Sequence, residues 1–351
     1  MYKEIVFEKL EVLRHKSDIV ILAIESSCDE TSAAVTKGRD VLSCVIASQI
    51  EIHRRFGGVV PEIASRNHIC AIDNMVDEAL TEAKLSLDDI DAIAVTYGAG
   101  LLGALLVGVS YAKALAYAKS LPLIAVSHIK GHIAANYIAD KCLKPPYLCI
   151  LASGGHTAII DVFNYDGFKV IGTTQDDAVG EAFDKVARVL GLPYPGGPEV
   201  QKLAEYGQNC IKFPRAFKNE DTFDFSYSGL KTSVINYLHN AEARGEKVVA
   251  ADVACSFQAA AVDVIVDNAE RALRKTDYKT VVIAGGVASN TALRSKVANL
   301  GKKMDVKVIY PPLMLCTDNA AMIGVAAYIL IKSGAQSADL SLDAKATVEI
   351  E

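Results

Sequence analysis

The same unit of structure can be recognised twice in this sequence of 351 residues. An apolar segment at residues 19–24 enters a small polar loop, residues 25–32, and continues into a second apolar segment. The apolar segment at residues 147–152 does the same through the loop at 153–157. Continuous apolar runs of this length, joined by small polar residues, predict a β-strand, a tight turn and a second strand.

A second unit is also repeated. Residues 92–97 form an apolar strand segment that enters Gly98-Ala99-Gly100 and then a helical run to about residue 120, while residues 281–284 enter Gly285-Gly286 and a second helix. Glycines and small hydroxyl residues in such loops allow backbone N–H groups to approach a phosphate, although either hairpin loop alone could be an ordinary turn. The duplication predicts a two-lobed α/β chain that resembles the actin-like ATPase/sugar kinase (ASKHA) superfold, with a nucleotide in the cleft between the lobes.

The length also favours two domains. We expect an N-terminal extension at residues 1–18, which is either a short amphipathic helix or mobile. The first lobe is predicted at 19–133 and is completed by a C-terminal helix at 318–333. The second lobe is predicted at 134–317, and a polar tail follows at 334–351.

Composition limits the class of protein. The chain is 51% hydrophobic and 22% charged, which is typical of a globular protein with a large core. The longest apolar run, residues 101–109, is interrupted by two glycines, so no membrane span is predicted. The first 17 residues contain Glu4, Glu8 and Glu11 and lack the apolar stretch of a secretory signal. Eight scattered cysteines without a C-x-x-C motif are typical of a reducing cytoplasm.

The net charge of −6 provides no general attraction for nucleic acid. A nucleic-acid partner would therefore need a local basic patch or a helper subunit. The best local candidate is the group Arg54, Arg55 and Arg66, although a solvated charged face explains the same residues.

His128 and His132 follow the apolar run 123–126, where a strand is predicted to lead into a helix. At this spacing the two imidazoles lie on one helix face, one turn apart, as in a chelating pair. The alternative is two histidines that bond to carbonyl groups or solvent. Asp318 offers a third ligand just before an apolar helix, although an N-cap would explain it equally well. Two imidazoles and one carboxylate suit Fe(II) and are acceptable to Zn(II).

In the second half, a helix is predicted from about Asp177 to Gly191. Glu181 and Asp184 share one face of this helix, where they could bind ribose hydroxyls or serve as ordinary helix charges. The segment 195–198, which contains two glycines between two prolines, is predicted to be a rigid turn close to a flat ligand.

Taken together, seven motifs resemble one family. They are ESSCDET at 25–31, GGVVPEIASR at 57–66, SGGHT at 153–157, GEAFDK at 180–185, YPGGP at 194–198, SYSGLK at 226–231 and CTDN at 316–319. In this order they resemble the TsaD/Gcp family of tRNA N6-adenosine threonylcarbamoyltransferases, over roughly residues 19 to 332.

The resemblance implies functional residues. It assigns one divalent metal per chain, Fe(2+) in preference to Zn(2+), to His128, His132 and Asp318. It also implies a threonylcarbamoyl-AMP site made of Leu151, Ala152, Ser153, Gly154, Gly155, Asp184, Gly197 and Asn290. It further implies a cytoplasmic protein that forms a complex with TsaB and TsaE in bacteria. Lys130 and Ala99 depart from the bacterial pattern, and Lys130 puts the local charge near the substrate or a partner in doubt.

The implied reaction transfers the threonylcarbamoyl group from threonylcarbamoyl-AMP to N6 of adenosine 37, in the anticodon loop of tRNAs that read ANN codons, and releases AMP. The residues do not identify a general base, for which Asp29, Glu30 and His156 are candidates.

Three other functions are considered. The first is an ATPase or phosphotransferase of the same superfold. The second is a zinc peptidase, which usually has Glu after its first metal-binding histidine, where this chain has Ile129. The third is an inactive scaffold, which would be expected to lose its metal ligands.

Overall fold

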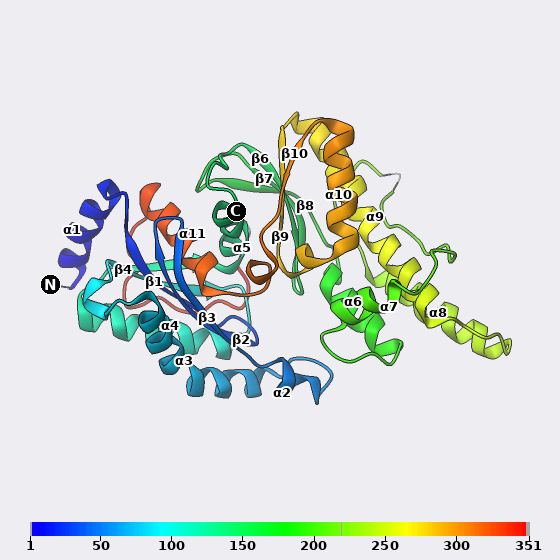
Figure 1. The fold of residues 1–351 in the computed structure, drawn as a ribbon, viewed down its shortest axis with the longest axis horizontal. Coiled ribbons are helices and arrows are strands. Elements are labelled where there is room, and N and C mark those ends of the chain that lie inside the picture. Colours follow the sequence, from blue (N-terminus) through cyan, green and yellow to red (C-terminus); the bar gives the residue numbers. More distant parts are fainter. Residues whose placement is uncertain (1, 219, 349–351) are drawn as a thin grey trace. The chain divides into compact units, whose positions relative to one another are not determined.

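The computed structural model describes residues 2–218 and 220–348, and the chain divides into two compact units (Figure 1). One unit comprises Met1–Lys144 together with Thr317–Glu351, and the other comprises Pro145–Cys316. Each unit is built around one five-stranded sheet.

The sheet of the first unit has the order β3-β2-β1-β4-β5. Its strands are β1 (Val20–Glu25), β2 (Glu30–Lys37), β3 (Asp40–Ser48), β4 (Ala92–Gly98) and β5 (Leu123–Ser127). β1 is antiparallel to β2 and parallel to β4. Residues 21–24 of β1 are fully buried. Their continuous apolar sequence is explained by this central position, because both faces of the strand are covered.

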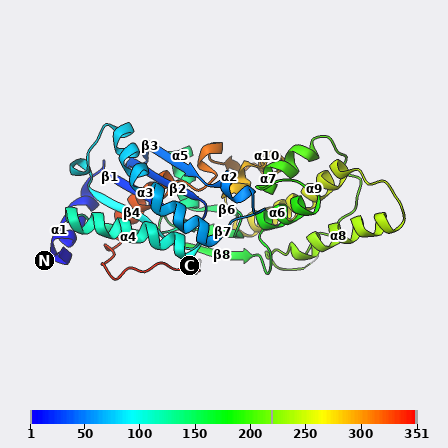
Figure 2. The ribbon, with the colours of Figure 1, turned by 90° about the horizontal axis from the view of Figure 1, so that it is seen from below.

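Helices cover both faces of this sheet. They are α1 (Tyr2–His15), α2 (Ile50–Arg54), α3 (Pro61–Ala83), the short η1 (Leu87–Asp89), α4 (Leu102–Lys119), α5 (His128–Ala139) and α11 (Ala320–Lys332). α3 and α4 lie side by side, as Figure 2 shows, and pack on the face that carries Leu22 and Ile24. α11 packs on the opposite face, where a Cβ at Gly324 would lie 3.3 Å from the Cβ of Ala23.

The sheet of the second unit has the order β10-β9-β6-β7-β8. Its strands are β6 (Tyr147–Ala152), β7 (Thr157–Val162), β8 (Phe168–Thr173), β9 (Thr280–Ala284) and β10 (Lys307–Ile309). Its helices are α6 (Val179–Val189), α7 (Gly196–Ala204), α8 (Ser228–Ala243), α9 (Ala250–Thr276), α10 (Thr291–Met304) and the short η2 (Gly286–Ser289) and η3 (Leu313–Leu315). Read from β8 to β10, the strand order and directions repeat those of the first sheet from β3 to β5. The predicted duplication is therefore confirmed.

The division between the units differs from the predicted boundary at 133/134. α5 continues to Ala139 and packs closely on α11, where a Cβ at Gly131 would lie only 2.6 Å from Cδ1 of Ile323. Because the chain cannot leave the first unit in the middle of this buried helix, the boundary moves to 144/145. The second boundary moves by one residue, to 316/317.

The predicted extension and tail both belong to the first unit. Residues 2–15 form α1, in which Val6, Leu10 and Leu13 are buried. The tail forms backbone hydrogen bonds with two strands of the first sheet. The N–H of Ala338 donates to the carbonyl of Leu123 (2.7 Å), and the N–H of Lys345 donates to the carbonyl of Tyr97 (2.8 Å). The polar composition of the tail did not indicate this packing, since most of its bonds use backbone groups.

Among residues 2–218 and 220–348, no helix combines the length and the apolar character needed to cross a membrane.

Candidate active site

α5 places two imidazoles together. Ser127 ends β5 and caps the helix, with its Oγ accepting the N–H of Lys130. His128 and His132 then lie one turn apart and are only 7% and 1% exposed. Their ring centroids are 4.5 Å apart, with the rings nearly perpendicular at 79°. The predicted i, i+4 arrangement is therefore present in the interior of the first unit.

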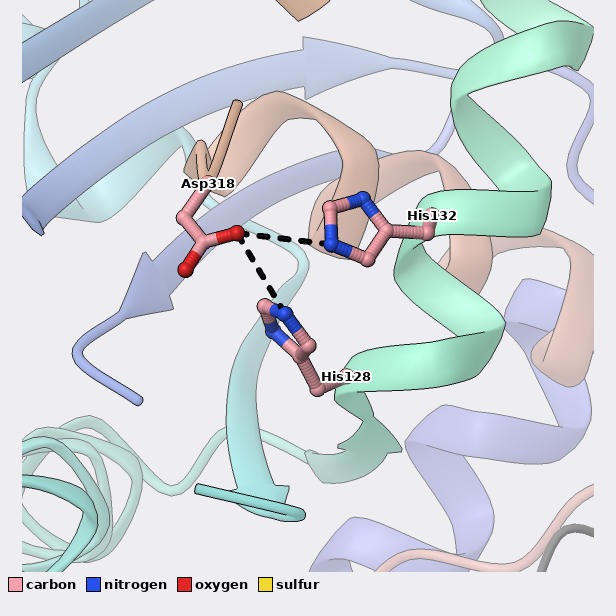
Figure 3. A group of neighbouring side chains, drawn as sticks. All are labelled: His128, His132 and Asp318. Atoms are coloured by element: carbon pink, nitrogen blue, oxygen red, sulfur yellow. Dashed lines mark ion pairs between the residues drawn. The ribbon is translucent and has the colours of Figure 1, made fainter. Parts of the chain in front are cut away.

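Asp318 faces both histidines (Figure 3). Its Oδ1 lies 3.3 Å from Nε2 of His128 and 3.3 Å from Nε2 of His132. The alternative of an N-cap is wrong for this residue, because Asn319 caps α11 by accepting the N–H of Met322 at 2.9 Å. Since the neighbouring residue performs the capping, the Asp318 carboxylate is available to the imidazoles.

The three side chains fit a divalent cation. One ligand atom from each lies within 4.8 Å of the others. Ligands about 2.0–2.2 Å from a shared metal are separated from one another by roughly 3.0–3.6 Å, which agrees with the 3.3 Å separations seen here. Both ring nitrogens of His132 are buried and neither makes a hydrogen bond of good geometry, although Nε2 lies 3.3 Å from Oδ1 of Asp318. A nitrogen in that state is costly unless it binds a ligand, so a metal would satisfy it.

The charges of this group are coupled. Burial lowers the pKa of His128, but the Asp318 and Glu25 carboxylates outweigh this effect and raise that pKa well above its usual value. Burial and the neighbouring His128 lower the pKa of His132. Burial would raise the pKa of Asp318, but the two imidazoles hold it well below its ordinary value. The site is therefore arranged to keep one positive charge beside an ionised carboxylate.

The implied adenylate residues all lie in the second unit, and most of them surround one sheet edge. Leu151 and Ala152 end β6 and are buried. The turn that follows is closed by two bonds, from the N–H of Ser153 to the carbonyl of His156 (2.8 Å) and from the N–H of His156 to Oγ of Ser153 (3.1 Å). A Cβ at Gly154 or Gly155 would meet nothing within 4 Å, so this backbone borders open space.

Other segments approach this turn from the same edge. The N–H of Gly180, in the first turn of α6, donates to the carbonyl of Ser153 at 3.2 Å. Gly285 follows β9 with φ +90°, and a Cβ there would lie 2.4 Å from the carbonyl oxygen of Ala152, so only glycine fits. The carboxyl ends of the parallel strands β6 and β9 thus carry two loops in contact, which is where ligands of open α/β sheets bind.

Asp184, Gly197 and Asn290 lie on the adjoining segments. Oδ1 of Asp184 accepts the N–H of Gly196 at 2.7 Å, so the segment predicted as a rigid turn is in fact the first turn of α7. A Cβ at Gly197 would meet nothing within 4 Å. Asn290 caps α10 through Leu293 (3.0 Å) and donates to Gln258 (2.8 Å), so its side chain also has a structural role.

Comparison with known proteins decides between the families that share this fold. The sequence model described as "TsaD: tRNA N6-adenosine threonylcarbamoyltransferase" matches residues 40–325. Relatives named tRNA N6-adenosine threonylcarbamoyltransferase include one from Clostridioides difficile (strain 630), 54% identical over 95% of this chain and 99% of the relative. Another, from Clostridium botulinum (strain Kyoto / Type A2), is 57% identical over 93% of this chain and 97% of the relative. The chain belongs to the TsaD family.

Solved structures agree with the TsaD assignment at the level of the fold. Full-length HypF, in a phosphate- and nucleotide-bound form, has a TM-score of 0.62 at 16% identity and covers 91% of this chain and 47% of its own. The activator of 2-hydroxyisocaproyl-CoA dehydratase from Clostridium difficile, with bound ADPNP, has a TM-score of 0.52 at 13% identity, covering 90% of this chain and 96% of its own. The predicted ASKHA fold class is confirmed. As a member of the TsaD family, the chain is an acyltransferase, and the alternative of an ATPase or phosphotransferase is not favoured.

The three candidate bases have different surroundings. Asp29 is buried, at 6% exposure. Burial, together with the neighbouring Asp29, raises the pKa of Glu30 to about 9, so at neutral pH Glu30 is protonated and is a poor base. His156 lies in the second unit, where its backbone closes the turn after β6.

Sequence reasoning missed the polar residues behind the candidate metal ligands. Glu25, Ser27 and Thr96 are all buried and contact His128 or one another. The available signal was a charged or hydroxyl residue at the end of an otherwise apolar strand, at positions 25 and 96. It also missed Asp176, which accepts bonds from the hydroxyls of Ser226 and Ser228 and so holds the SYSGLK motif.

Proposed function

We propose that this protein transfers the threonylcarbamoyl group of threonylcarbamoyl-AMP to N6 of adenosine 37 in tRNAs that read ANN codons, releasing AMP. The observation that carries the proposal is the group of the buried His128 and His132 and the partly buried Asp318, in a chain whose relatives carry the transferase name. One divalent metal per chain, Fe(2+) in preference to Zn(2+), suits two imidazoles and a carboxylate.

Each set of residues has a separate task in this proposal. His128, His132 and Asp318 would hold the metal, which when bound supplies a Lewis acid that polarises the threonylcarbamoyl carbonyl. The turn at 153–155, whose glycines border open space, presents backbone to the phosphate of the adenylate. Leu151, Ala152, Asp184, Gly197 and Asn290 complete the adenylate site from the adjoining strand and helix ends.

The transfer is a substitution at the carbamoyl carbon and needs no oxidant or reductant. The N6 lone pair of adenosine attacks the carbamoyl carbon and forms a C–N bond. The bond from that carbon to the phosphate oxygen breaks, and AMP leaves with the electron pair. The attacking nitrogen loses one proton. An anticodon-loop base is readily splayed out for this attack, because it is not held in a duplex.

We also propose that tRNA binding is shared with partner subunits, TsaB and TsaE in bacteria. The net charge of −6 supports this, because an acidic protein has little general attraction for RNA. Cytoplasmic localisation is part of the same proposal, since tRNA is the substrate and the cysteines of the described residues are all free thiols.

The test is a transfer assay with threonylcarbamoyl-AMP and an unmodified tRNA that reads ANN codons, with and without partner proteins. Mass spectrometry detects the modified nucleoside. We expect product with the wild type and with His239→Ala, which removes an exposed histidine of α8, but none with His128→Ala or Asp318→Ala. Product formation that survives both ligand substitutions would refute the metal centre. ATP hydrolysis without any transfer would instead support a phosphotransferase.

A further inference from the structure

Behind His128 lies a carboxylate that is completely shielded from solvent. Glu25 is 0% exposed, and its Oε2 lies 3.1 Å from Nδ1 of His128, the ring nitrogen that does not face Asp318. The hydroxyl of Ser27 lies 3.2 Å from the same nitrogen. We propose that Glu25 is the positioning carboxylate of the metal centre, which holds His128 as the Nδ1–H tautomer so that Nε2 faces the metal.

Glu25 is itself rigidly held. Its Oε1 accepts the N–H of Ser27 at 2.6 Å, and its Oε2 accepts the hydroxyl of Thr96 at 2.7 Å. Through these bonds, Glu25 at the end of β1 is tied to the following loop and to β4. Its contact with His128 links all three to the first residue of α5. A carboxylate fixed at both oxygens orients an imidazole better than a mobile one, because the ring loses less rotational freedom when it binds a metal.

The two histidines differ in this respect. Nδ1 of His132, the nitrogen that does not face Asp318, has no hydrogen-bond partner, whereas Nδ1 of His128 faces a carboxylate and a hydroxyl. His128 is therefore the pre-oriented ligand, and His132 is held mainly by packing in α5. A completely buried carboxylate is unfavourable on its own. A divalent cation beside His128 offsets that cost, so Glu25 contributes to metal affinity through charge as well as orientation.

This inference rests on the metal centre of the proposed function, and the experiment separates the two. Zn²⁺ affinity is measured by competition with a chromophoric chelator for the wild type, Glu25→Gln, Glu25→Asp and His132→Ala. Asp263→Asn is the control, because it removes a partly buried carboxylate of the second unit that binds Arg215 and Lys296. The absorption spectrum of each Co²⁺-loaded protein reports ligand geometry, which a loss of stability alone would not change.

We expect Glu25→Gln to weaken Zn²⁺ binding by about 10- to 100-fold and to alter the Co²⁺ spectrum, with partial recovery in Glu25→Asp and no change in Asp263→Asn. Wild-type affinity and an unchanged spectrum in Glu25→Gln would overturn the inference and leave the metal centre intact. Wild-type protein that binds Zn²⁺ no better than His132→Ala would refute the metal centre itself, and the inference with it.

Circular dichroism of the metal-free proteins shows whether Glu25→Gln folds. If Glu25→Gln does not fold, Zn²⁺ affinity is measured for Thr96→Val instead, because this substitution removes only the hydroxyl that holds Oε2 of Glu25. A smaller but measurable loss of Zn²⁺ affinity in that variant supports the inference, and wild-type affinity overturns it.

Discussion

Gly131 lies between the two histidines on α5, and its replacement by alanine tests how closely the metal centre depends on helix packing. A Cβ at this position would lie 2.6 Å from Cδ1 of Ile323 and 3.2 Å from Cγ of Met322, both on α11. Carbon atoms prefer separations of about 3.5–4.0 Å, so α11 or its side chains must move by roughly 1 Å. Asp318 lies only two residues before α11, so this movement reaches the third ligand.

Two effects of opposite sign set the magnitude. Overpacking of this kind costs about 1–3 kcal/mol, and the gain of alanine over glycine inside a helix offsets about 1 kcal/mol of it. We therefore expect Gly131→Ala to lower the free energy of unfolding by about 0–2 kcal/mol. Zn²⁺ affinity should fall as well, because the 3.3 Å separations around Asp318 are disturbed.

Gly229→Ala on α8 is the matched control, since a Cβ there would meet nothing within 4 Å and only the helix propensity changes. Calorimetry of each metal-free variant and Zn²⁺ titration by chelator competition are the assays. If Gly131→Ala is stabilised as much as Gly229→Ala and binds Zn²⁺ like the wild type, the packing argument is refuted.

Three further predictions concern the same unit. Asn319→Ala should cost about 1 kcal/mol by removing the cap of α11 and should weaken Zn²⁺ binding, because Asp318 can then turn to the free N–H groups; unchanged urea unfolding would contradict this. Zn²⁺ at 100 times its dissociation constant should stabilise the wild type by about 2.7 kcal/mol and leave Asp318→Ala unaffected in a thermal shift assay. The folded-state pKa of Glu30, about 9, lies above its ordinary value of 4.5, so its contribution to stability is complete below pH 4.5 and is lost as the pH rises through 9. Glu30→Gln should therefore flatten the fall in stability of the metal-free protein between pH 5 and 9, and an unaltered pH profile of urea unfolding would argue against a protonated Glu30.

Local sequence was sufficient for much of this protein. The continuous apolar runs at 19–24 and 147–152 predicted β-strands, and the structure explains their lack of a polar side because both strands are central in their sheets. The spacing of His128 and His132 predicted a shared helix face, since the period of a helix is a local property. The repeated strand–loop pattern predicted the duplication, and the seven motifs predicted the family.

Other features were decided only by tertiary structure, because they depend on which distant segments pack together. Asp318 and Asn319 are adjacent and both suit an N-cap, and only the packing of α11 on α5 directs one to the helix and the other to the imidazoles. The end of the first unit at residue 144 depends on the same buried contact. Glu25 and Thr96 are 71 residues apart in the chain and meet because β1 and β4 are parallel neighbours. Sequence patterns report the period and polarity of one segment, whereas the group of Glu25, Ser27 and Thr96 behind His128 arises from contacts among several segments.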